Sequence, residues 1–353
     1  MKILIVTVYN SHNSGSFLQA YAMMSVLKKM GYDVRFLKRE LQGSSHDIRK
    51  VAKSVLFAIS KLNIGQSFYA IREWFVYDKL QKQFPVVCKD SNFYNEVDCV
   101  VLGSDTIWNL DSKVLRNQAS LYFGRDFLGK YVISYAASAA NSKIEVFRNV
   151  VTKQGGLSNL EFIMVRDEHT KSLVEQTTKK KAYLVTDPTL IATRDDFEPL
   201  KYVIKNKKPY VLLYCFGEFS AELILEIKSY AKELECDVIS MPINRSWCNS
   251  SVMSSPQNMI SYFDKAEAVI TDTFHGTAFS LIYEKPFAVY DAGKNKVREL
   301  LKLYGEENRL FITSERLKDI LREKNNVVSS GRLDAVRNSS IEKLKEALSK
   351  ISK

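Results

Sequence analysis

The chain has 353 residues, 46% of them hydrophobic, which suits two domains of ordinary size, each with its own core. Its five cysteines and four histidines lack paired metal-ligand spacing, so we expect no metal site and no cofactor. No apolar run approaches the roughly 18 residues that cross a bilayer, and the N-terminus does not resemble a signal peptide, so we expect a cytoplasmic protein. The net charge of +11 favours an anionic partner, and without a nucleic-acid motif we expect a phosphate ligand or a membrane surface.

The N-terminal segment is predicted to form a strand at residues 2–8, a helix at 17–30 and a second strand at 33–37. The turn after the first strand lies where open α/β sheets place ligands. It lacks the GxGxxG pattern of nicotinamide and flavin sites. Its residues Asn13, Gly15 and Ser16 are candidates for contact with a different ligand, although ordinary capping of the helix explains them as well.

Between about residues 45 and 84, apolar residues recur at helical spacing among lysines and arginines. This pattern predicts a basic amphipathic helical insertion. One interpretation is a peripheral contact with the cytoplasmic membrane surface, and the other is a domain helix with a solvated face. We favour the second, because runs of charge usually mark solvated surface.

Polar residues then follow several predicted strands at their carboxyl ends. The strand at 97–102 leads into Gly103, Ser104 and Asp105, and the strand at 162–165 leads into Arg166. Strands at 131–136 and 182–185 also end in polar residues. This is the sheet edge where parallel α/β folds carry chemistry.

The second half of the chain repeats the alternation of strands and helices. A charged, irregular stretch at 194–209 predicts a linker. We therefore expect an N-terminal Rossmann-like domain at 1–193, a C-terminal one at 210–332 and a terminal helix at 333–353 that packs back on the first domain. Two doubly wound Rossmann-like domains facing a cleft form the architecture of B-type glycosyltransferases, which is the fold class we predict.

The segment from Thr271 to Thr277 is the most informative turn of the chain, because it joins an apolar strand to a helix and contains His275. Backbone amides and the helix dipole make a helix N-terminus attractive to anions. The plainer interpretation is that Asp272 or Thr273 caps the helix and that His275 is an ordinary surface residue. The segment alone does not decide between these interpretations.

Six short sequence motifs, in this order along the chain, resemble those of the polysaccharide pyruvyl transferase family. They lie at residues 13–22, 103–109, 133–138, 165–168, 186–189 and 271–277, the last followed by Lys285-Pro286-Phe287. The resemblance implies transfer from phosphoenolpyruvate to a sugar of a cell-surface polysaccharide or its lipid-linked precursor, as a pyruvate ketal. Two positions depart from the expected pattern: Thr106 stands where glutamine is expected, and Lys296 where arginine is frequent. Lysine lacks the bidentate fork of arginine, which puts one donor or acceptor contact in doubt.

The chemistry that the resemblance implies assigns a role to each candidate residue. His275 would bind or protonate the phosphate, with the amides of Gly276 and Thr277 as a cradle, and Lys296 would add to the donor site. Arg166 would hold the carboxylate, unless it only pairs with Asp167 or Glu168 on the surface. Asp105 would act as the base, although an Asx-turn explains it equally well. The acceptor would contact four residues, Asn13, Gly15, Ser16 and Trp108, although a tryptophan beside a strand end is more often only a packing residue.

Two other classes of function stay open. A nucleotide-sugar glycosyltransferase of the same architecture is the alternative enzyme, although we find no clear acidic pair for a ribose. A catalytically silent glycan- or anion-binding protein is the third class, and the presence of His275, Arg166 and Asp105 together argues against it. The remaining histidines are expected to be structural or solvated: His12, His46 and His169.

Overall fold

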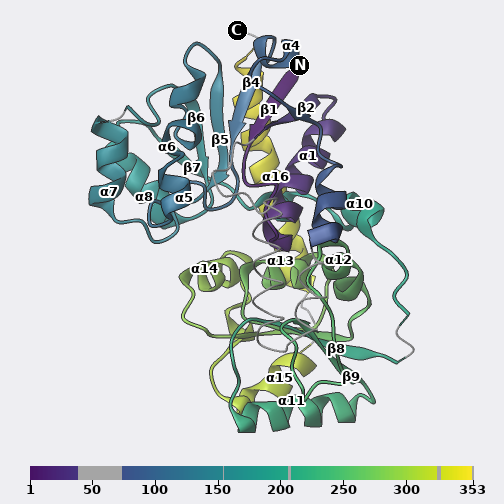
Figure 1. The fold of residues 1–353 in the computed structure, drawn as a ribbon. Helices are drawn as coiled ribbons and strands as arrows, with labels where there is room; N and C mark the ends of the chain where they lie inside the picture. The colour runs from purple at the N-terminus through teal and green to yellow at the C-terminus, as the bar shows by residue number, and fades with distance from the viewer. Residues whose placement is uncertain (39–73, 154, 206–207, 324–326, 352–353) are drawn as a thin grey trace, which may run out of the picture. The chain divides into compact units, whose positions relative to one another are not determined.

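The computed structural model describes residues 1–38, 74–153, 155–205, 208–323 and 327–351 (Figure 1). The chain divides into two compact units. The first contains residues 1–12, 16–192 and 336–353, and the second contains residues 13–15 and 193–335. Each unit is an α/β domain with one parallel sheet.

The first unit contains a seven-stranded parallel sheet in the order β3-β2-β1-β4-β5-β6-β7. The strands are β1 (Lys2–Val6), β2 (Asp33–Leu37), β3 (Val86–Val87), β4 (Cys99–Leu102), β5 (Val132–Ala137), β6 (Leu160–Val165) and β7 (Ala182–Leu184). All residues of β4 and β5 are buried, as expected for strands covered on both faces, which is why they read as unbroken apolar runs. The strand order reverses between β1 and β4, and this reversal is the topological switch point of the sheet.

The helices of the first unit lie between its strands along the chain. They are α1 (Ser14–Lys29), residues 74–81, α4 (Asn92–Asn95), α5 (Lys113–Arg116), α6 (Ala119–Tyr122), α7 (Ile144–Arg148), α8 (Glu168–Thr177) and α9 (Pro188–Ile191). The C-terminal helix α16 (Val327–Ser349) also reaches this unit. There Ser340 accepts a hydrogen bond from the amide of Thr186 (3.0 Å), and the Tyr131 hydroxyl donates to the carbonyl of Ala347 (2.9 Å).

The second unit repeats this plan with six parallel strands in the order β10-β9-β8-β11-β12-β13. The strands are β8 (Tyr210–Cys215), β9 (Asp237–Pro242), β10 (Ser250–Ser251), β11 (Ala268–Thr271), β12 (Phe287–Tyr290) and β13 (Leu310–Phe311). Helices α11 (Ala221–Glu233) and α15 (Leu317–Arg322) lie on one face, and α12 (Pro256–Lys265), α13 (Phe274–Ile282) and α14 (Asn295–Tyr304) on the other (Figure 1). The switch point of this sheet lies between β8 and β11.

The two predicted doubly wound Rossmann-like domains are confirmed, and most predicted elements match within a few residues. The short strands β3, β10 and β13 were not predicted, because strands of two residues carry no sequence period. The first helix begins at Ser14 rather than Phe17, and α7 continues directly into a π-helical turn, Asn149–Lys153.

Two predicted segments need separate mention. Within the stretch expected to be a linker, the chain forms α10 (Arg194–Phe197) and a 3₁₀ turn (Glu198–Leu200), with Phe197 and Leu200 buried. Most of the predicted basic insertion at 45–84 lies outside the described residues, and its described part includes the helical residues 74–81.

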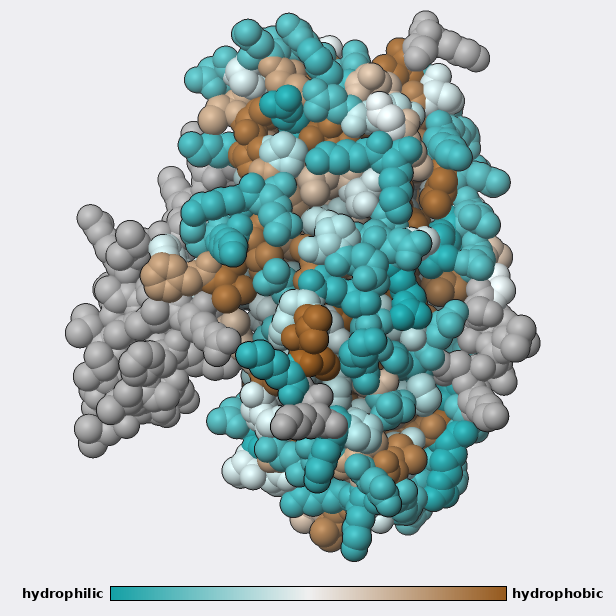
Figure 2. Space-filling view, turned by 90° about the vertical axis from the view of Figure 1, so that its right-hand side faces the viewer, coloured by the Kyte–Doolittle hydropathy of each residue, from teal (hydrophilic) through white to brown (hydrophobic). Residues whose placement is uncertain are grey.

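The face of the molecule in Figure 2 is mostly hydrophilic, with hydrophobic residues in small separate groups. Exposed apolar residues among polar ones are normal for a globular protein. No helix in the described part of the chain combines the length and the apolar character needed to span a membrane.

Candidate functional site

The first polar cluster lies where β4 ends, in the first unit. Asp105 follows β4 through Gly103 and Ser104, and its backbone φ is 71°, a left-handed conformation that aspartate tolerates better than most residues. Its carboxylate accepts hydrogen bonds from the Ser16 hydroxyl (2.6 Å) and the Thr106 amide (2.7 Å). Ser16 therefore does not cap α1 but lies inside it and orients Asp105. The bonded amide belongs to the next residue and not to the one two positions on, so this contact is not the Asx-turn considered as the alternative.

A buried glutamine that was not among the predicted site residues holds this cluster together. Gln19 is fully buried in α1, and its amide nitrogen donates to the Ser16 carbonyl (2.9 Å) and lies 3.2 Å from the Thr7 hydroxyl. The Ser104 hydroxyl donates to the Gln19 side-chain oxygen. A lone glutamine one helical turn after Ser16, within an apolar stretch, is the signal that could have identified it.

Arg166 follows β6 and has a different partner from the one expected. Its Nη1 lies 2.8 Å from Oδ2 of Asp187, which is fully buried, while Asp167 caps α8 by accepting the amide of Thr170 (2.7 Å). Burial alone would lower the pKa of Arg166, but the attraction of Asp187, followed by that of Asp105, outweighs burial and raises it. Arg166 is thus a permanent cation placed among the carboxylates of the first unit.

The second polar cluster lies at the turn between β11 and α13, in the second unit. Thr273 is the capping residue of α13, and its hydroxyl accepts the amide of Gly276 (2.8 Å). The amide of Thr277 donates to the carbonyl of Thr273 (3.0 Å), and Thr277 is fully buried. The prediction that these two amides cradle a phosphate is therefore wrong, because the helix itself uses both of them.

Gly276 is required by packing rather than by ligand binding. A Cβ at this position would lie 2.0 Å from Oγ1 of Thr271 and 2.7 Å from Oγ1 of Thr273. Thr271 in turn donates to the carbonyl of Tyr214 on β8 (2.7 Å), so it is held in place. The glycine allows α13 to begin directly against the end of β11.

Substitution of Gly276 by alanine is expected to lower the free energy of unfolding by about 1–3 kcal/mol, because the added methyl overlaps a fixed threonine. Urea denaturation measures this loss. The matched control is Gly331→Ala in α16, where a Cβ would meet no atom within 4 Å and helix propensity should raise stability by up to about 1 kcal/mol. Equal effects of the two substitutions would contradict the packing role of Gly276.

Asp272 holds the neighbouring loop and does not cap the helix. Its carboxylate oxygens accept the amides of Phe216 (3.1 Å) and Gly217 (2.9 Å), which follow β8. The ammonium of Lys294 donates to the Asp272 carbonyl (2.9 Å) and lies 3.5 Å from its carboxylate. Lys294, which was not predicted, brings a positive charge to this turn. The predicted Lys296 is an exposed residue in the first turn of α14.

His275 lies in the first turn of α13 and is partly exposed. Residues 13–15 belong to the second unit, and there a Cβ on Gly15 would lie only 2.2 Å from Nδ1 of the histidine. Glycine at this position lets the backbone approach the imidazole closely. The neighbouring Ser14 hydroxyl lies 3.0 Å from that of Ser254, and Asn13 is exposed.

Two other ionisable groups next to this turn are unsuited to chemistry. Burial raises the pKa of Tyr214 to about 12, even though a hydrogen bond with Ser254 acts in the opposite direction. Burial also raises the pKa of the Cys215 thiol well above its usual range. Both side chains therefore stay protonated near neutral pH.

Trp108 is a correction to the predicted acceptor site. The indole is fully buried, its Nε1 donates to the carbonyl of Tyr122 (2.8 Å), and its ring packs against Phe123 and Phe147. A ring with no exposed face cannot stack on a sugar, so Trp108 is a core residue.

Each polar cluster lies at the switch point of its own sheet. Asp105 and Ser16 follow β4 and β1, while His275 and Phe216 follow β11 and β8.

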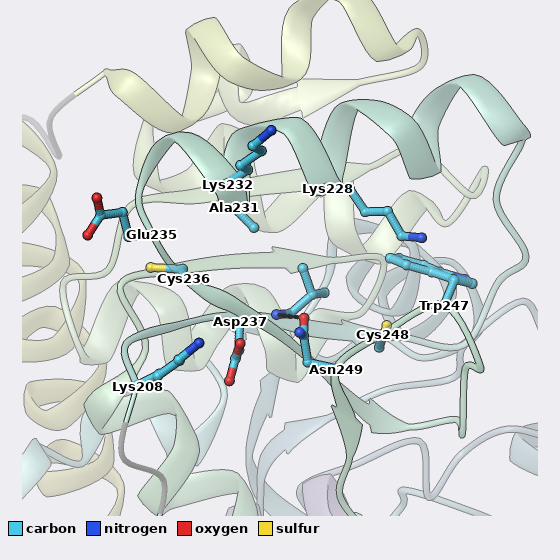
Figure 3. A pocket seen from close by; sticks show the side chains of 11 residues that line it. Lys208, Lys228, Ala231, Lys232, Glu235, Cys236, Asp237, Trp247, Cys248 and Asn249 are labelled. Carbon is cyan, nitrogen blue, oxygen red and sulfur yellow. Dashed lines mark hydrogen bonds between the residues drawn. The ribbon is translucent and has the colours of Figure 1, made fainter.

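A hollow of about 700 Å³ lies elsewhere, beside the first residues of β9, where Lys228, Lys232 and Trp247 line it (Figure 3). Ligands of open α/β sheets bind outside the carboxyl ends of the strands, so we assign the candidate active-site residues to the two clusters and not to this hollow. Across the described segments, no group of three or more histidine, cysteine or acidic side chains is placed to hold a metal ion.

The family model for polysaccharide pyruvyl transferase matches residues 13–294, which include both clusters. The chain belongs to the polysaccharide pyruvyl transferase family. Membership identifies it as a transferase acting on a polysaccharide. It confirms the family that the six motifs predicted. No curated protein matches this transferase in sequence.

Solved structures show the same fold at low sequence identity. A putative UDP-N-acetylglucosamine 2-epimerase from Listeria monocytogenes has 11% identity and a TM-score of 0.53, with 98% of this chain and 96% of that chain covered. UDP-GlcNAc 2-epimerase from Neisseria meningitidis, bound to UDP-GlcNAc, has 13% identity and a TM-score of 0.52, with 98% of this chain and 100% of that chain covered. The transferase therefore has the predicted fold of the B-type glycosyltransferases, and this likeness concerns the fold alone.

Proposed function

We propose that this transferase moves the pyruvyl group of phosphoenolpyruvate onto a sugar of a cell-surface polysaccharide or of its lipid-linked precursor. A proton adds to the methylene carbon, using the electrons of the double bond, and a sugar hydroxyl adds to C2 while its proton passes to a base. The bond from C2 to the phosphate oxygen then breaks, and inorganic phosphate leaves with the electron pair. A second hydroxyl of the same sugar closes the ketal and loses its proton.

In the second unit, His275 and Lys294 are the groups we assign to the phosphate. The imidazole lies at the positive end of α13, and the ammonium lies beside the same turn, 2.9 Å from the carbonyl of Asp272. A departing phosphate gains negative charge, which a cation and a protonated imidazole stabilise. His275 would bind the phosphate or donate a proton during the transfer.

In the first unit, we assign the donor carboxylate to Arg166 and the role of base to Asp105. Arg166 pairs with Asp187 through Nη1, and its planar guanidinium matches the two oxygens of a carboxylate, which is why we assign the donor carboxylate to it. Asp105 is a carboxylate that already accepts one hydroxyl proton in a hydrogen bond, that of Ser16. A sugar hydroxyl in the same position would be oriented for deprotonation.

The observation that supports this proposal most is the placement of the second cluster. The turn that contains His275 joins β11 to α13 at the switch point of its sheet, and Lys294 lies against it. This position offers an anion the ammonium of Lys294 and an imidazole that can donate a hydrogen bond. For the acceptor, we favour a lipid-linked sugar reached at the cytoplasmic membrane surface.

Incubation with phosphoenolpyruvate should release inorganic phosphate only when a sugar acceptor is present. The acceptor should gain the mass of one pyruvate less one water, since the ketal replaces two hydroxyl protons. Phosphate release and mass spectrometry test this with galactose, mannose and N-acetylhexosamine acceptors. Absence of acceptor-dependent release with the whole panel would contradict the proposal.

A nucleotide-sugar glycosyltransferase is the second candidate. One structure of the same fold, from Neisseria meningitidis, is bound to UDP-GlcNAc. If this alternative is correct, UDP or GDP sugars should raise the melting temperature, whereas phosphoenolpyruvate should not. The opposite pattern supports the pyruvyl transferase assignment.

A further inference from the structure

Phe216 is an exposed aromatic residue at the candidate site of the second unit. It directly follows Cys215, the last residue of β8, and 53% of it is exposed. Several other large apolar residues are exposed singly, and single exposure by itself has no functional meaning. Phe216 differs from them because buried charged side chains form hydrogen bonds with the backbone of Phe216 and of the next residue, Gly217.

Two buried ionic side chains hold the loop after β8. Asp272, which is 2% exposed, accepts the amides of Phe216 and Gly217 with its two carboxylate oxygens. Arg245, which is 5% exposed, donates to the carbonyl of Gly217 (2.5 Å). Buried charges are costly unless they are hydrogen-bonded, so this pair of contacts specifies one conformation of the loop.

The same contacts place Phe216 beside the turn of His275. Tyr214 and Thr271 are paired in the parallel ladder between β8 and β11, so Phe216 and Thr273 follow at corresponding positions on neighbouring strands. Adjacent strands lie about 4.8 Å apart. Asp272, which immediately precedes Thr273, is the residue that binds the Phe216 amide. The backbone of Phe216 thus lies beside the turn that contains the group assigned to the departing phosphate, and its half-exposed ring lies 6.1 Å from the buried ring of Tyr214.

The chemistry of an aromatic face selects one of the two substrates. Phosphoenolpyruvate is small and carries a phosphate and a carboxylate, so it has little apolar surface to offer. A hexopyranose has an apolar face of C–H groups, which packs on an aromatic ring while its hydroxyls stay in polar surroundings. Building on the proposed function, we propose that Phe216 packs against the C–H face of the acceptor hexopyranose and selects a pyranose ring as the acceptor. Phe216 takes the role that the buried Trp108 cannot fill.

Direct binding tests this role without relying on turnover. Saturation-transfer NMR with methyl glycosides of galactose, mannose and N-acetylglucosamine, in the absence of phosphoenolpyruvate, should show transfer to ring C–H protons with the wild-type protein. Phe216→Ala should weaken binding of the preferred glycoside about tenfold, whereas Phe216→Trp and Phe216→Tyr should keep it within about threefold. The control Leu225→Ala removes an exposed apolar side chain from α11 and should change nothing.

Kinetics then separate the two substrates. With turnover established, Phe216→Ala should raise the KM for the acceptor about tenfold and leave the KM for phosphoenolpyruvate within twofold. The inference is overturned if no glycoside of the panel binds the wild-type protein, if Phe216→Ala binds it equally well, or if both KM values rise together. Glycoside binding without phosphate release would instead contradict the proposed reaction while supporting Phe216 as a sugar-binding residue.

Discussion

Replacing His275 by alanine should reduce pyruvyl transfer by about 10²- to 10⁴-fold, the contribution of a positioned acid or base. The histidine is partly exposed at the start of α13, and its ring lies against Gly15 within the second unit. The fold should survive, because no core side chain is removed. Initial rates of phosphate release at saturating phosphoenolpyruvate and acceptor measure the effect, and the melting temperature reports the fold.

Two variants distinguish the functions of this imidazole. His275→Gln keeps hydrogen-bonding groups but cannot transfer a proton, so a fall in kcat as large as that of alanine indicates an acid, and a raised KM for phosphoenolpyruvate indicates binding. His169→Ala is the control, since His169 lies in the first unit with its Nε2 3.0 Å from the carbonyl of Ser142. More than a tenth of wild-type activity in His275→Ala would contradict our assignment.

The sheet positions of the candidate residues could be predicted from the sequence. Buried parallel strands appear as short apolar runs, and the polar residues that follow them collect at one edge. Asp105, Arg166 and His275 all follow such runs. In the structure Asp105 lies three residues after the end of β4, Arg166 directly after β6, and His275 in the first turn of the helix that follows β11. The predicted strand-to-helix turn at 271–277 was therefore correct in its backbone.

The partners of these residues could not be predicted, because they lie far away in the sequence. Asp187 pairs with Arg166 across 21 positions, and Gln19 bonds Ser104 across 85. Local patterns contain no information on such pairs, so only the neighbours Asp167 and Glu168 could be expected as partners of Arg166. The aromatic rings that pack against Trp108 also come from later segments, so its neighbours in the sequence could not decide between stacking on a sugar and packing in the core.

Replacing Arg166 by alanine should abolish transfer and also destabilise the fold by about 3–5 kcal/mol, because it leaves a buried charge without its partner. Asp187 is fully buried, and its Oδ1 accepts both the amide (3.0 Å) and the hydroxyl (2.8 Å) of Thr189. Loss of activity in this variant alone would therefore not identify a role in binding phosphoenolpyruvate. Urea denaturation of the variant measures the structural part.

The double variant Arg166→Ala/Asp187→Asn separates the two roles. Asparagine keeps an oxygen for Thr189 and removes the uncompensated charge, so much of the lost stability should return. Activity should not return, since no cation is left to hold the donor carboxylate. The single variant Asp187→Asn retains Arg166 and should lose far less activity than either variant that lacks the arginine. Recovery of transfer together with stability in the double variant would show that Arg166 serves the fold of the first unit and does not bind the substrate.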